Sequence, residues 1–161
     1  LAQALLLNAL GRPKEAIPVL DKILESSADE ELRFATLIEK GDTYFLLGDT
    51  DATAYPEAIA AWRLAASPEV PARWRNQALF KIGGASERLG EIPAALSSYH
   101  DVLSQKSDLQ PEYFWYYKAG FDAARILESQ AQVDEAIVIY EKLAAKDGPR
   151  SEEARQRLNA L

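Results

Sequence analysis

Apolar residues recur at intervals of three and four positions along nearly the whole chain, and no alternating strand pattern appears. This period is typical of amphipathic helices, so the sequence predicts an all-α protein. We expect nine helices, over residues 1–10, 13–26, 30–47, 55–66, 71–89, 92–104, 111–129, 132–145 and 151–160.

Prolines and glycines mark the expected helix ends. Five prolines fall in first turns, where a missing N–H is tolerated: Pro13, Pro56, Pro71, Pro93 and Pro111. Three glycines follow expected helix ends, where a left-handed residue closes the last turn: Gly11, Gly48 and Gly90. Pro18 lies inside its helix, and we expect it to kink or delay that helix.

The helices also repeat a fixed spacing of residue types. Each copy has a small residue in its first helix: Ala4, Gly41, Gly83 and Ala124. An alanine follows early in the second helix: Ala16, Ala58, Ala95 and Ala136. A bulky residue stands four positions after that alanine: Leu20, Trp62, Tyr99 and Tyr140. Self-similarity of this kind predicts stacked helical hairpins, none of which buries its apolar face alone.

The turns between paired helices read GRPKEAI, GD(TDATA)YPEAI, GEIPAAL and AQVDEAI. In these motifs the chain resembles the tetratricopeptide repeat (TPR) family of bacterial type, over about residues 1–145. The resemblance implies a single solenoid over 1–161, a right-handed α-α superhelix of about four hairpins plus a C-terminal helix. The expected units are repeats over 1–27, 30–67, 71–105 and 111–146, followed by a capping or partial-repeat helix over 150–161.

Two departures from the family pattern stand out. The family unit is about 34 residues, and the repeats here are longer. Five extra residues, Thr50–Ala54, lie in the second turn, and about one extra helical turn accompanies the aromatic run Tyr113–Tyr117.

Composition narrows the function classes. The net charge of −7 disfavours nucleic acid and anionic lipid as partners. The first eleven residues are uncharged but too short to span a bilayer, so we expect no direct membrane insertion. Without Cys the redox compartment stays open, so both a cytoplasmic and a periplasmic or cell-envelope location are compatible with the sequence. Without an initial Met we expect a fragment of a longer chain.

Few residues point to catalysis. The single histidine, His100, has no cysteine to share a zinc site with, and no serine nucleophile motif accompanies it. The acidic turn Asp49–Thr53 lacks the glycine and distal glutamate of a calcium loop. We therefore expect no enzyme, no metal and no cofactor.

The resemblance implies instead a groove lined by the first helices, which binds a peptide or helix of a protein partner. The implied lining residues are Gln77, Phe80, Lys81, Gly84, Glu87, Arg88, Lys118, Phe121, Asp122, Arg125 and Glu128, with Ile38, Asp42 and Phe45 from the second repeat. The family's Lys/Asn/Arg clamp for a chaperone tail is not reproduced, because its Asn positions hold Asp42, Gly84 and Arg125.

Aromatic clusters leave alternatives open. Trp62 and Trp74, beside Arg63, Arg73 and Arg75, either pack between repeats or bind an acidic segment. In the run Tyr113–Tyr117, one neighbouring helix cannot bury every side chain.

Within that run, Phe114 and Trp115 are the candidate interface residues. The sequence predicts a non-catalytic interaction scaffold. The alternatives are a homodimerising module, and an accessory region of an enzyme or cell-envelope protein whose active part lies elsewhere.

Overall fold

The computed structural model describes residues 1–104 and 113–161, and its described part is all-α. The helices in these residues are α1 (Ala2–Ala9), α2 (Pro13–Ser26), α3 (Glu30–Gly48), α4 (Ala54–Ala65), α5 (Ala72–Arg88), α6 (Ile92–Ser104), α7 (Tyr113–Ser129), α8 (Val133–Ala145) and α9 (Ser151–Leu158). The predicted helices are confirmed with small shifts at their ends. Gln105 and residues 111–112, including Pro111, lie outside the described residues.

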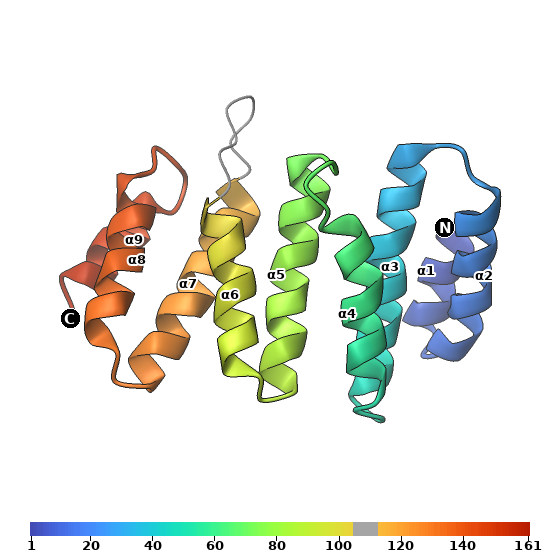
Figure 1. The fold of residues 1–161 in the computed structure, drawn as a ribbon, viewed down its shortest axis with the longest axis horizontal. Coiled ribbons are helices and arrows are strands. Elements are labelled where there is room, and N and C mark those ends of the chain that lie inside the picture. The colour runs from blue at the N-terminus through green and yellow to red at the C-terminus, as the bar shows by residue number, and fades with distance from the viewer. Residues whose placement is uncertain (105–112) are drawn as a thin grey trace.

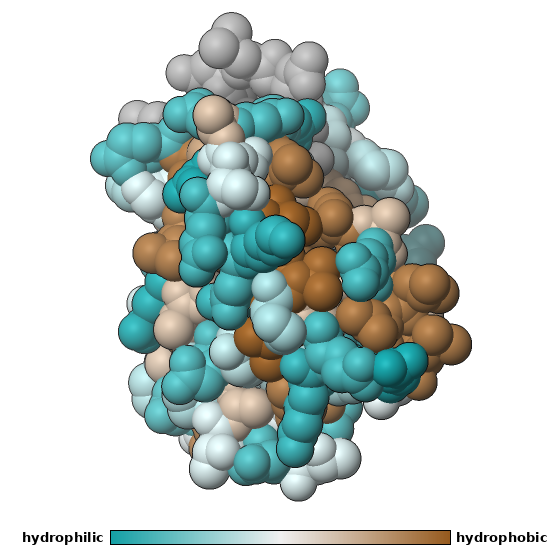
Figure 2. Space-filling view, turned by 90° about the vertical axis from the view of Figure 1, so that its right-hand side faces the viewer, coloured by the Kyte–Doolittle hydropathy of each residue, from teal (hydrophilic) through white to brown (hydrophobic). Residues whose placement is uncertain are grey.

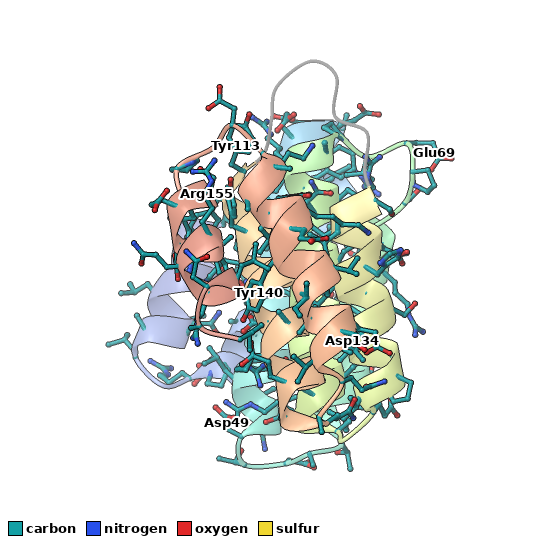
Figure 3. All side chains as sticks on the ribbon, turned by 90° about the vertical axis from the view of Figure 1, so that its left-hand side faces the viewer. Asp49, Glu69, Tyr113, Asp134, Tyr140 and Arg155 are labelled. Atoms are coloured by element: carbon teal, nitrogen blue, oxygen red, sulfur yellow. The ribbon has the colours of Figure 1, made fainter. Side chains whose placement is uncertain are left out.

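The helices stand side by side as a row of antiparallel hairpins, from α1 and α2 at one end to α8 and α9 at the other (Figure 1). Each helix packs against the next one in the chain. Successive connections lie at opposite ends of the hairpins. Asp49, in the α3–α4 connection, and Glu69, in the α4–α5 connection, therefore lie at opposite ends of α4 (Figure 3). In addition, α3 contacts α5, and α5 contacts α7. We call the side formed by α1, α3, α5 and α7 the first-helix face.

Small residues allow the paired helices to approach closely. A Cβ at Gly41 would overlap the indole of Trp62, and one at Gly83 would overlap the ring of Tyr99. Both rings come from the second helix of the same hairpin and are almost fully buried. The repeated spacing therefore has a steric cause, because the space left by the absent side chain on one helix is filled by an aromatic ring of the next helix.

The helix ends differ in part from the prediction. Gly11 and Gly90 have φ values of +71° and +74°, which confirms their left-handed conformation. The expectation for Gly48 was wrong, because it is the last residue of α3 and lies against the ring of Tyr55. Ala131 occupies the corresponding turn of the last hairpin with φ +60°.

Pro18 does not delay its helix. It lies inside α2, which begins at Pro13. Pro13 suits the first position of α2, because its φ is already helical and a backbone N–H at this position would have no partner within the helix.

The five-residue insertion forms a hydrogen-bonded turn between α3 and α4. Asp51 Oδ1 accepts hydrogen bonds from the backbone N–H and the hydroxyl of Thr53, at 3.1 and 2.6 Å. Tyr55 donates its phenol to Asp49 Oδ1 at 3.0 Å. Ala54, the last inserted residue, already belongs to α4.

Within the described residues, no helix is both long and apolar enough to cross a membrane.

Candidate binding cavity on the first-helix face

A cavity of about 480 Å³ opens between α1, α3 and α5. Its lining residues are Asn8, Glu39, Asp42, Phe45, Leu46, Trp62, Phe80, Lys81 and Gly84. All but Trp62 come from first helices, so the cavity belongs to the first-helix face. Its volume and mostly apolar lining are those of a site that receives a small ligand or a protruding side chain.

Gly84 leaves room for this cavity. The nearest atom to a Cβ built at Gly84 is the phenol oxygen of Tyr99, 4.0 Å away, so the position is open. The residues at the corresponding positions of the neighbouring hairpins, Asp42 and Arg125, carry polar side chains. A glycine at this position therefore exposes the aromatic walls behind it.

An ion pair forms part of the lining. Lys81 Nζ lies 2.7 and 2.8 Å from Asp42 Oδ1 and Oδ2, and 5.8 Å from the centroid of the Trp62 ring. Burial raises the pKa of Asp42, and Lys81 opposes that rise. Trp62 Nε1 donates to the Ile38 carbonyl oxygen at 3.1 Å, which holds the indole against α3.

Glu39 is a second carboxylate in the lining. Its Oε1 accepts a hydrogen bond from Asn8 Nδ2 at 2.6 Å, and the same amide donates to Thr43 Oγ1 at 2.8 Å. Burial raises the pKa of Glu39; the Asn8 hydrogen bond opposes this rise and the charge of Asp42 adds to it. Asn8 Oδ1 is buried and has no hydrogen-bond partner among residues 1–104 and 113–161. This corner of the cavity therefore has more acceptors than donors.

The structure brings together only part of the predicted lining. Phe80, Lys81 and Gly84 meet Asp42 and Phe45 around the cavity. The other predicted residues of α5 do not line it: Gln77, Glu87 and Arg88.

Glu87 and Arg88 have partners within the protein. Glu87 accepts a hydrogen bond from the Tyr99 phenol at 2.6 Å. Arg88 lies 3.8 Å from Asp49 and stacks over Phe45 at 5.8 Å.

The predicted residues of α7 make other contacts. Arg125 pairs with Glu87 at 2.7 Å and with Asp122 at 3.5 Å. The guanidinium of Arg150 covers the Phe121 ring at 4.3 Å.

Glu128 accepts a hydrogen bond from Tyr140. Lys118 lies within 5.6 Å of the centroids of Phe80, Phe114 and Trp115. These contacts join α7 to its neighbours, and through Phe80 the contact of Lys118 reaches the cavity wall.

Four lining residues were missed by sequence reasoning: Asn8, Glu39, Leu46 and Trp62. The repeat spacing held a signal for two of them. Glu39 precedes Gly41 by two positions, as Lys81 precedes Gly83. Asn8 follows Ala4 by four positions, as Phe45 follows Gly41.

The two candidate interface residues differ in exposure. Phe114 is 59% exposed. Trp115 is half-buried and packs on Phe80, with ring centroids 5.3 Å apart. Tyr116 and Tyr117 are buried.

The aromatic-basic cluster near the α4–α5 connection is occupied by internal contacts. Trp62 is 2% exposed, and Trp74 Nε1 donates to Glu31 Oε2 at 2.9 Å. Arg73 pairs with the same carboxylate. These contacts match the packing interpretation of the cluster.

The lone histidine borders a different hollow. A cavity of about 500 Å³ lies between α6, α7 and α8, where His100 stands with Leu103, Val138 and Ile139 among the lining residues. Across residues 1–104 and 113–161, no group of three or more His, Asp or Glu side chains is placed to hold a metal ion.

No family model matches the chain, and no curated protein or solved structure matches it either. The function proposed below therefore rests on this chain's own residues and geometry.

Proposed function

We propose that this chain is a non-catalytic protein–protein interaction module of the TPR type, which binds a peptide or helix of a partner protein along the first-helix face. In this proposal the hairpins form a right-handed superhelix with the first helices on its inner side. The cavity beside Gly84 receives one side chain of the partner.

Two observations support the architectural part. The spacing from a small residue to an aromatic ring of the paired helix recurs in successive hairpins, as in Gly41 with Trp62 and Gly83 with Tyr99. Direct contacts between α3 and α5, and between α5 and α7, draw the first helices together. A row of hairpins whose first helices lie closer together curves toward that side.

The single observation that carries the binding part is the cavity itself. Aromatic walls from Phe45, Trp62 and Phe80 surround a small number of polar groups, which is the usual composition of a recognition pocket. Because the cavity opens between consecutive first helices, a chain segment lying along that face would pass its mouth.

A cavity-filling variant tests this function. Gly84→Leu places a side chain in the open space, and Gly84→Ala is the matched control because a Cβ meets no close atom there. Peptides selected from a random library against the native protein are measured by fluorescence anisotropy. We expect Gly84→Leu to abolish their binding and Gly84→Ala to preserve it. A library that yields no binding peptide, or peptides that bind Gly84→Leu normally, would contradict the proposal.

The N-terminal end favours a second candidate, self-association with a second copy of the chain. Leu5 and Leu6 of α1, and Leu10 directly after it, are 48%, 60% and 60% exposed, and apolar surface appears at that end of the molecule (Figure 2). The helix α1 carries no charged residue, so two such ends meet without repulsion. Leu6→Glu with Leu10→Glu would then shift the sedimentation of a dimer to that of a monomer. A native protein that sediments only as a monomer would exclude this candidate.

A further inference from the structure

We infer that the side chain received by the cavity on the first-helix face is a cation, the guanidinium of an arginine in the partner segment. This inference rests on the proposed peptide-binding function and assigns the chemistry of the residue that enters. It follows from the charge balance of the lining, the nature of its walls and the poor fit of the other side-chain classes.

The charged groups of the lining do not balance. Glu39 and Asp42 are two carboxylates, and Lys81 is the one cation that lines the cavity in the described residues. Lys81 is committed to both oxygens of Asp42, at 2.7 and 2.8 Å, so that pair is close to neutral. Within the part of the chain that the structure describes, the Glu39 carboxylate accepts a hydrogen bond only from the neutral amide of Asn8, and burial raises its pKa. The charge of Lys81 also acts to lower the pKa of Glu39, but its ammonium is bonded to Asp42. Among the described residues Glu39 therefore has no ion pair of its own, which an incoming cation would supply.

The walls favour the same charge. Phe45, Trp62 and Phe80 present aromatic rings to the cavity, and ring faces attract cations, guanidinium groups above all. The protein already places its own cations over these rings, with Lys81 near Trp62 at 5.8 Å and Arg88 near Phe45 at 5.8 Å. A flat guanidinium can lie against an aromatic wall and at the same time donate two hydrogen bonds to one carboxylate.

Other side chains fit less well. An acidic side chain would face Glu39 and Asp42, and the lining ammonium of Lys81 is already paired. An apolar side chain would remove water from Glu39 without offering a donor, which is unfavourable for a carboxylate. A volume of about 480 Å³ accommodates an arginine together with its flanking backbone.

The indole N–H of Trp62 provides a reporter inside the cavity wall. The chain has three tryptophans, and the Trp62 signal in a ¹H–¹⁵N spectrum is assigned by its loss in Trp62→Phe. The probes are the acetylated N-methylamides of arginine, of citrulline as its neutral counterpart, and of phenylalanine. We expect arginine to shift the Trp62 signal saturably, with citrulline at least about tenfold weaker.

Two variants locate the effect. Glu39→Gln removes the unbalanced charge and keeps the side-chain shape, so the preference for arginine over citrulline should disappear. Glu15→Gln is its matched control, because Glu15 is an exposed residue of α2 outside the cavity lining. It should leave the preference intact.

The outcomes separate this inference from the proposed function. Binding of phenylalanine as tight as that of arginine, a preference that survives Glu39→Gln, or the absence of any shift with arginine would overturn the assignment of a cation. In each of these cases, library peptides that still depend on Gly84 would leave the peptide-binding function standing. Library peptides indifferent to Gly84→Leu would overturn both.

Discussion

The ammonium of Lys81 on α5 lies 2.7 and 2.8 Å from the two carboxylate oxygens of Asp42 on α3. This pair joins two successive hairpins and also lines the cavity. Both side chains are largely shielded from water, at 22% and 31% exposed. One contact therefore serves the stability of the array and the shape of its candidate site.

Asp42→Asn should lower the free energy of unfolding by about 1–2 kcal/mol, because Lys81 would keep its charge in a shielded place without a carboxylate. Urea denaturation of the two proteins at neutral pH measures the difference. The matched control is Glu15→Gln, which breaks an exposed pair with Arg12 and should change stability much less. Equal effects of the two substitutions would show that the Lys81–Asp42 pair contributes no more than a surface pair.

Glu39→Gln should raise the melting temperature at neutral pH. Burial raises the pKa of Glu39 above its ordinary value of 4.5, so the ionised group favours the unfolded state. That penalty is complete above the folded-state pKa and is lost as the pH falls below 4.5, where the group is protonated in both states. Thermal unfolding at neutral pH and below pH 4.5 checks this, since the gain should vanish in acid.

Glu15→Gln is the control for this pH dependence, because the pKa of Glu15 is shifted in the opposite direction to that of Glu39. The hydrogen bond from Arg12 lowers the pKa of Glu15, so its ionised form stabilises the fold. Glu15→Gln should therefore lower the melting temperature slightly at neutral pH, and this loss should vanish in acid. A gain at neutral pH for both variants would indicate a general effect of removing negative charge from a chain of net charge −7.

Gly41→Ala should destabilise the protein by about 1–3 kcal/mol, because its Cβ would overlap the buried indole of Trp62. Gly84→Ala lies in α5 with open space around it and should be neutral or up to about 1 kcal/mol stabilising, since alanine favours helix. Chemical denaturation of the two variants side by side gives the comparison. Similar losses for both would mean that helix propensity, rather than the steric fit to Trp62, decides the outcome.

Ala131→Gly should stabilise the turn between α7 and α8 by about 1 kcal/mol, because Ala131 adopts φ +60°, a conformation unfavourable to residues with a Cβ. The reverse substitution, Gly90→Ala, should destabilise the corresponding turn, where φ is +74°. Thermal unfolding of both variants measures these changes. A loss of stability in Ala131→Gly would show that the entropy of glycine in the unfolded chain outweighs the relief of strain.

The helices could be predicted from sequence because their signals are local. Pro13 at the first position of α2, and the apolar period of three and four residues along each helix, require no knowledge of neighbours. Gly48 was misjudged because its role is set by a contact with Tyr55, across a turn lengthened by five residues. Ala131 stands at the repeat position of Gly11 and Gly90, but its residue type does not indicate a left-handed conformation, since alanine rarely adopts it.

The site was predicted only in part. Register along the repeats identified Phe80 and Lys81, because equivalent positions of stacked helices share a face. It did not identify Trp62, which reaches the cavity from a second helix past the glycine opposite it. Nor could register show that Arg150 covers Phe121, because Arg150 lies outside the four predicted repeats.

The ion pairs between different elements share one direction, which has a consequence for the order of the repeats. In every such pair of the described residues, the cation belongs to the later element and the carboxylate to the earlier one: Lys40–Asp21, Arg73–Glu31, Lys81–Asp42, Arg88–Asp49 and Arg125–Glu87. The first three hairpins thus present acidic groups to the hairpin after them, and the second, third and fourth hairpins present basic groups to the hairpin before them. Hairpins joined in reversed orientation would bring like charges together, so recombined or extended arrays of this sequence have an electrostatic polarity that must be kept.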